Sequence, residues 1–191
     1  MKTLNLSLFY RSLYADNRNW RNYLMRTLML FLIGGSLLSH LLDSLTSVVA
    51  APGLDFFHAI TMLNFVFITT MGVALFSSAV TEEKEVDSLY LLLMTGVTPF
   101  SLLVSKGGSK FIIGLMLILA QLPFTLLAVS LGGISFYQVV CVYVSLIAYT
   151  FFLANLALFF SVITNRTYKA ATLTLFSLVS FLVLGYYYHF F

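Results

Sequence analysis

Charged residues are scarce in this sequence. Only 9 % of its 191 residues are Asp, Glu, Lys or Arg, whereas 60 % are hydrophobic. Soluble domains usually carry about 25 % charged residues, so this chain has too few to cover a soluble fold with a polar surface. The composition therefore predicts an all-α integral membrane protein, because helices satisfy their own backbone hydrogen bonds in lipid.

The sequence also lacks the motifs of several function classes. Its one cysteine, Cys141, falls in an apolar stretch and has no partner for an intramolecular disulfide. It contains no serine-hydrolase, zinc-peptidase or phosphate-loop motif, since Lys106-Gly107-Gly108 has the wrong order for such a loop. We predict no catalytic residue and no ATP hydrolysis by this chain. The net charge of +3 forms no concentrated patch, so nucleic acid is not an expected partner.

Five apolar stretches are long enough to cross a hydrocarbon core, which requires about 20 helical residues. The predicted spans cover residues 27–45, 56–80, 111–131, 137–163 and 170–189. They form a single transmembrane domain over residues 1–191, made of an arm (1–26), spans 1 and 2 (27–80), a polar loop (81–110), spans 3 and 4 (111–163) and span 5 (170–189). Pro123 should kink the third span. Apart from Asp43 near the outer end of the first span, none of the five contains Asp, Glu, Lys or Arg, so we expect an energy source outside this chain rather than ion coupling within it.

The segment before the first span carries half of the ten basic residues. On a helix, its apolar residues lie on one side and two arginines on the opposite side. Such an amphipathic helix lies in the membrane interface, with its arginines toward anionic lipid. A break near Asp16 and Asn17 would instead make the arm partly irregular. The predicted membrane-interface residues are Phe9, Arg11, Leu13, Arg18 and Trp20.

Residues 81–110 are the one long polar interruption between the spans. Acidic residues crowd its beginning, and from Val86 to Leu93 apolar residues recur at helical spacing. Gly96 can end a helix, and Thr98-Pro99 fits the N-cap and first position of the next one. The pattern predicts a short helix that is apolar nearly all round and needs a protein to cover it. The alternative is a solvated loop that only returns the chain to the membrane.

This stretch resembles the first cytoplasmic loop in the membrane subunits of ABC-2 type ABC transporters. The resemblance is carried by Glu83-Lys84-Glu85, Ser88-Leu89, Leu91-Leu92-Leu93, Thr95, Pro99 and Ser105-Lys106. The sequence departs from the family pattern at Asp87, Tyr90 and Gly96, where Gly, an acid and Pro are common. The amphipathic start, the Gly132-Gly133 turn and a basic loop at Asn165-Arg166 extend the likeness over most of the chain.

The resemblance implies an N-terminal elbow helix and a cytoplasmic coupling helix between spans 2 and 3. It implies a permease subunit of an ATP-driven exporter. The family usually has six spans, whereas the apolar stretches of this chain predict about five. A separate ATPase subunit would bind ATP and Mg²⁺, and a second copy or a homologous permease would complete the membrane unit. The residues expected to contact the ATPase are Glu82, Glu83, Glu85, Ser88, Leu89, Leu92, Leu93, Thr95 and Pro99. Two other classes stay open, a membrane scaffold or assembly protein without transport and a stand-alone secondary carrier.

Polar residues within the spans are the candidates for a substrate path. They are Asn64, Gln121 and Asn155, and hydrogen bonding between helices explains them equally well. At the outer ends of the spans, histidine and aspartate are spaced as possible metal ligands. These residues are His40, Asp43, Asp55, His58 and His189. Since Asp55 also fits an N-cap and interfacial histidines need no ligand, we predict no metal site.

The basic residues predict the orientation of the chain. All ten lie in the arm, in residues 81–110 or in residues 165–169, and the other loops have none. Since Lys and Arg concentrate in cytoplasmic loops, we expect the cell membrane as location and a cytoplasmic N-terminus. In a Cys141→Ser background, an impermeant thiol reagent added outside should label Ser47→Cys and spare Ser88→Cys. The reverse labelling would refute this orientation.

Overall fold

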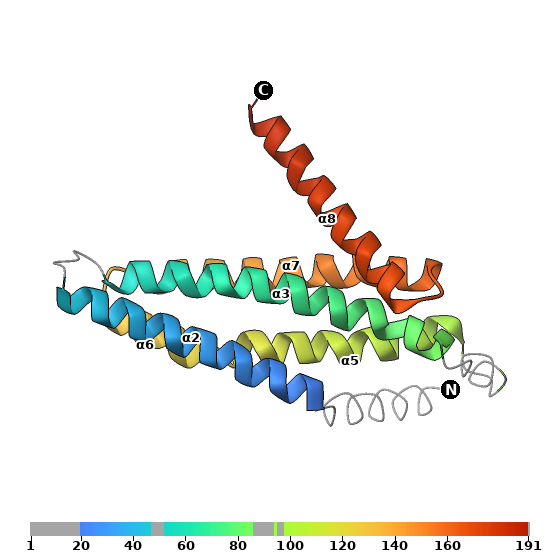
Figure 1. Ribbon diagram of the computed structural model, residues 1–191, viewed down its shortest axis with the longest axis horizontal. Coiled ribbons are helices and arrows are strands. Elements are labelled where there is room, and N and C mark those ends of the chain that lie inside the picture. The colour runs from blue at the N-terminus through green and yellow to red at the C-terminus, as the bar shows by residue number, and fades with distance from the viewer. Residues whose placement is uncertain (1–19, 47–51, 86–93, 95–97, 191) are drawn as a thin grey trace.

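A computed structural model describes residues 20–46, 52–85, 94 and 98–190 of the chain. Within these residues the structure is helical and has no strand. Its helices are α2 (Trp20–Thr46), α3 (Pro52–Glu85), α5 (Pro99–Leu119), α6 (Leu122–Ser130), α7 (Phe136–Ile163) and α8 (Thr167–Phe190) (Figure 1). The predicted all-α class is confirmed for this part of the chain.

Four described segments are long and apolar enough to cross a membrane. They are Gly53–Glu85, Ser101–Ser130, Phe136–Ile163 and Thr167–Gly185. These four segments support the prediction of a membrane protein. The span predicted at 27–45 appears as a shorter apolar segment, Thr27–Ser39, within α2.

Helix α3 is the centre of the bundle. It contacts each of the other described helices and packs most extensively against α7. The approach to α7 is close because α3 has glycine at position 72, where a Cβ atom would lie 2.2 Å from Leu153 Cδ2. Near its other end, a Cβ atom on Gly53 would lie 2.2 Å from the Gly132 carbonyl oxygen. Small residues of this kind let membrane helices approach closely.

Hydrophobic clusters hold the bundle together at three levels of α3, and the middle one consists of Ile68, Ile118 and Leu146. The other two lie toward the ends of α3. The first joins α3 to α2, α5, α6 and α7, and its buried residues include Met29, Ile33, Phe56, Ile60, Leu117, Ala128 and Val139. The second joins α3 to α7 and α8 through Val73, Phe76, Leu153, Ala157 and Leu178. Both clusters consist of side chains from helices far apart in sequence, so they fix how the helices pack.

The third predicted span is broken, as Pro123 predicts. Helix α5 ends at Leu119 and α6 begins at Leu122, with proline in its first turn. The backbone N–H of Gln121 donates to the Ile118 carbonyl at 3.3 Å across this break. Proline has no N–H for a helical hydrogen bond, which explains the interruption of an otherwise continuous membrane segment.

The connections at helix starts follow local sequence signals. Gly132 and Gly133 take φ of +88° and +92° in the turn before α7, a backbone region that favours glycine. Ser135 then caps α7 and forms a reciprocal capping box with Gln138. The predicted cap of α5 is also confirmed, because the Thr98 hydroxyl accepts a hydrogen bond from the Ser101 N–H at 3.3 Å.

Both ends of the polar interruption at 81–110 are helical. Helix α3 continues to Glu85, and α5 begins at Pro99. The charges at positions 82–85, 106 and 110 therefore lie on helices. The helices extend because acids of α3 pair with lysines of α5, an interaction that hydropathy alone does not reveal.

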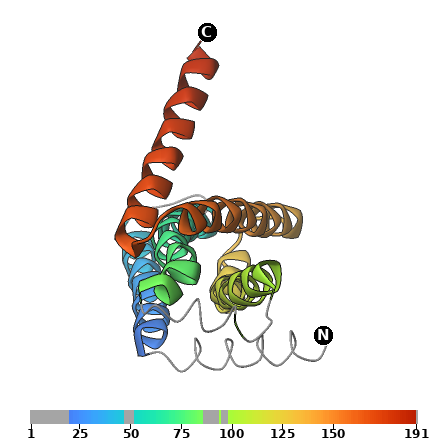
Figure 2. The same cartoon turned by 90° about the vertical axis from the view of Figure 1, so that its right-hand side faces the viewer.

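Helix α8 leaves the bundle along its second half (Figures 1 and 2). Its buried residues, Ala170, Thr174 and Leu178, lie on one face of its first half. Beyond Leu178 every residue whose burial is described is exposed, and most are large and apolar. This half of α8 therefore presents an apolar surface suited to lipid or to another membrane helix.

Candidate functional site: a polar junction at the end of helix α3

The last turns of α3 carry consecutive charged residues that reach three different helices. Toward α5, Glu83 Oε1 lies 2.7 Å from Lys106 Nζ, and Glu82 Oε2 lies 3.6 Å from Lys110 Nζ. Lys110 also donates to Ser78 Oγ at 2.6 Å. The Lys110 side chain is only 5 % exposed, and a buried ammonium group requires such partners. These contacts fix the end of α3 to α5.

Lys84 connects α3 to the C-terminal end of α7. Its ammonium group donates to the carbonyl oxygens of Ser161, Val162 and Thr164, at 3.3, 2.5 and 3.0 Å. The last carbonyl groups of a helix have no partner within that helix, and its C-terminus favours positive charge. Lys84 therefore acts as a cap for α7 that is supplied by a neighbouring helix.

Glu85, the next residue, connects α3 to the N-terminal end of α8. Its Oε1 atom accepts hydrogen bonds from the N–H of Thr167 at 2.7 Å and from the Thr167 hydroxyl at 3.1 Å. Thr167 is the first residue of α8, where free N–H groups favour an anion. Two adjacent residues of opposite charge thus cap two consecutive helices, each with the sign that the helix end favours.

Hydroxyl groups make further contacts about one turn earlier on α3, at Val80 and Thr81. Ser161 Oγ accepts hydrogen bonds from the backbone N–H groups of Val80 and Thr81, at 3.1 and 3.3 Å. The hydroxyls of Thr81 and Thr167 lie 3.0 Å apart. We call the whole set the polar junction. It comprises Thr81, Glu82, Glu83, Lys84 and Glu85 of α3, Lys106 and Lys110 of α5, Ser161 of α7 and Thr167 of α8.

The residues predicted to bind an ATPase fall into two groups. Glu82, Glu83 and Glu85 have partners within the chain, in the polar junction, and Pro99 opens α5. The remaining ones lie outside the described residues, namely Ser88, Leu89, Leu92, Leu93 and Thr95. The same holds for Phe9, Arg11, Leu13 and Arg18 of the predicted arm, whereas Trp20 is exposed at the start of α2. Sequence reasoning did not identify Ser161 or Thr167, because only the packing of α7 and α8 brings them to α3.

The three candidates for a substrate path do not form one site. Asn64 and Gln121 are buried, and their side-chain oxygens have no hydrogen-bond partner among the described residues. The Gln121 amide nitrogen lies 3.3 Å from both the Leu117 carbonyl and Met29 Sδ. Asn155 is exposed instead, and its amide donates to the Phe151 carbonyl of its own helix at 2.8 Å. Asn155 therefore lies apart, in a groove between α5 and α7.

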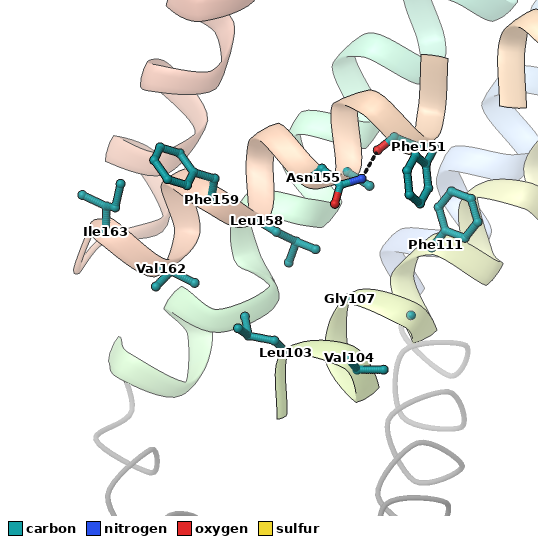
Figure 3. A pocket seen from close by; sticks show the side chains of 12 residues that line it. Leu103, Val104, Gly107, Phe111, Phe151, Asn155, Leu158, Phe159, Val162 and Ile163 are labelled. Carbon is teal, nitrogen blue, oxygen red and sulfur yellow. Dashed lines mark hydrogen bonds between the residues drawn. The ribbon is translucent and has the colours of Figure 1, made fainter. Parts of the chain in front are cut away.

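This groove lies beside the polar junction and measures about 540 Å³. Figure 3 shows its walls, formed by the first turns of α5 and the second half of α7. Asn155 is the one polar side chain that lines it. As for metals, the described residues contain no cluster of three His, Cys, Asp or Glu side chains.

No protein-family model, curated protein or solved structure matches this chain. Its function must therefore be inferred from its residues and from the geometry of the polar junction.

The capping role of Lys84 leads to a testable prediction. Lys84→Met removes the donor to three carbonyls, which should weaken the α7–α8 connection by roughly 1–2 kcal/mol. Amide hydrogen exchange over residues 161–170 should become faster, while exchange in the middle of α7 stays unchanged. Lys169→Met is the matched control, since Lys169 is exposed on α8. Equal exchange in both variants would show that Lys84 does not cap α7.

Proposed function

We propose that this chain is the membrane-spanning permease subunit of an ATP-driven ABC transporter. It is an exporter of the ABC-2 type, works with a separate nucleotide-binding subunit and pairs with a second permease. The polar junction is the observation that supports this proposal most. It joins α3 to α5, α7 and α8 within the predicted coupling loop, residues 81–110.

The distribution of charge supports a cytoplasmic position for the junction. The described basic residues outside α2 all belong to the helix ends at the junction or to the loop beside it, and they are Lys84, Lys106, Lys110, Arg166 and Lys169. The opposite end of the bundle, where Gly53 meets Gly132, has no Lys or Arg nearby in sequence. The positive-inside rule assigns the basic end to the cytoplasm, which is where an ATPase subunit would bind.

The junction suggests how motion of a partner would reach the membrane. Residues 86–97 connect Glu85 directly to the cap of α5 at Thr98. A displacement of this segment therefore moves the ends of α3 and α5 together, and Lys84 and Glu85 transfer it to α7 and α8. Helix α8 has 24 residues, or about 36 Å at 1.5 Å per residue. Because only its first half packs on the bundle, a small rotation at Thr167 becomes a large movement at its far end.

A stand-alone secondary carrier is the second candidate function, and Lys110 is the observation that favours it. This buried lysine lies on a membrane-spanning segment, and ionisable groups in such positions commonly couple ion movement to transport. Its partner Glu82 is 57 % exposed, however, so the pair reaches the aqueous end of the bundle. This position agrees better with an ion pair that joins two helices than with an ion path through the membrane.

The predicted coupling helix provides the test of the proposed function. Leu89→Asp with Leu93→Asp places two charges in the expected interface, where loss of each anchor costs upward of ~1–2 kcal/mol and burial of a charge adds to it. We expect the double variant to lose a copurifying ATPase and its vanadate-sensitive ATP hydrolysis. Expression and membrane insertion should stay near normal because both residues lie outside the predicted spans.

The matched control is Asn165→Asp with Tyr168→Asp, which adds two charges at exposed positions, one in the connection between α7 and α8 and one at the start of α8. This variant should retain the ATPase. If the Leu89 and Leu93 variant also retained its partner and the stimulated hydrolysis, these residues would not form the coupling contact.

A further inference from the structure

We propose that the groove between α5 and α7 binds an acyl chain of an anionic phospholipid, whose head group lies at the basic end of the bundle. The walls of the groove are apolar except for one amide. They are formed by α5 between Leu103 and Phe111 and by α7 between Phe151 and Ile163 (Figure 3). This inference requires a membrane but no ATPase partner, so it is independent of the proposed function.

The size of the groove suits a flexible apolar chain. Its volume of about 540 Å³ falls within the range of about 300–1,000 Å³ that small-molecule sites occupy. An acyl chain can follow the length of the groove between α5 and α7.

The position of the groove favours lipid as the source of that chain. Both walls belong to segments able to cross a membrane, Ser101–Ser130 and Phe136–Ile163. An empty groove in hydrocarbon would lose dispersion contacts along its walls. Lipid tails are the molecules present at this depth, and they are as apolar as the leucines that line the groove.

Two features of the walls suit an apolar occupant. A Cβ atom on Gly107 would lie 2.8 Å from Leu158 Cδ1, so glycine at this position lets α5 approach α7. The amide nitrogen of Asn155 already donates to the Phe151 carbonyl, which reduces its need for a polar ligand. Figure 3 shows Phe111 and Phe151 beside one another at one end of the groove, with their ring centroids 5.9 Å apart.

Basic residues near the other end of the groove favour a lipid with an anionic head group. Ile163, which lines this end, is the last residue of α7, and the exposed Arg166 follows it by three residues. Lys106 immediately precedes Gly107 on the opposite wall and is balanced by Glu83. Exposed basic residues next to a membrane span attract anionic head groups. A lipid with its chain in the groove would place its head group at this level.

The test uses phosphatidylglycerol that carries a photoreactive diazirine in one acyl chain, mixed into phosphatidylcholine vesicles that contain the full chain. Peptide mass spectrometry then locates the crosslinks. We expect labelling of residues 103–111 and 151–163 that saturates with probe fraction. Unlabelled phosphatidylglycerol should compete better than phosphatidylcholine does.

Val104→Trp fills the groove from its exposed wall and should lower groove labelling about tenfold, which corresponds to ~1.4 kcal/mol of binding. Phe176→Trp is the matched control on the exposed face of α8 and should leave groove labelling unchanged. Three results would overturn the proposal. They are labelling that rises linearly over all exposed faces, equal competition by the two lipids, and a groove that stays unlabelled because a second copy of the chain covers it.

Discussion

The structure depends on two adjacent charges at the end of α3. Lys84 satisfies carbonyl groups at the end of α7, and Glu85 satisfies donors at the start of α8. Because helix ends carry partial charges of opposite sign, only this order of the two residues suits the ends they contact. The short connection from Ile163 to Thr167 is therefore held by a third helix, and α8 takes its direction from that contact.

The central position of α3 follows from its sequence. Gly53 and Gly72 permit close backbone approach at two levels, while Phe56 and Phe76 fill the clusters on either side. The charged residues 82–85 then connect the same helix to α5, α7 and α8. Few of these contacts involve neighbours in sequence, so α3 joins helices that are far apart along the chain. The proposed transport function uses this property.

Much of the fold could be predicted from local signals. Composition predicted the membrane class, Pro123 the break between α5 and α6, and Thr98-Pro99 the start of α5. Each of these depends on residues close in sequence. Hydropathy did not indicate that α3 continues beyond the predicted end of the second span to Glu85, because it counts Glu83 as polar. It does not detect that Glu83 and Lys106 neutralise each other across two helices at 2.7 Å.

The site was predicted less completely than the fold. The acids at 82–85 were identified, but as contacts for a partner, and their contacts with Lys106, Lys110 and Thr167 require the packed bundle. The groove around Asn155 was not predicted, since its walls come from helices separated by more than one connection and their residues have no distinctive pattern. Asn64 and Gln121 were identified as polar residues within spans, but nothing in the sequence indicated that they would be buried apart from Asn155.

If this chain delivers the action of an ATPase to the membrane, the two proteins should form a stable complex. Affinity purification of the unmodified chain from its native membranes, followed by mass spectrometry of the intact complex, measures this. We expect a nucleotide-binding subunit in a stoichiometric amount, together with a second permease. A chain that purifies with no ATPase, in lipid and under mild conditions, would contradict it and would favour a scaffold or a stand-alone carrier.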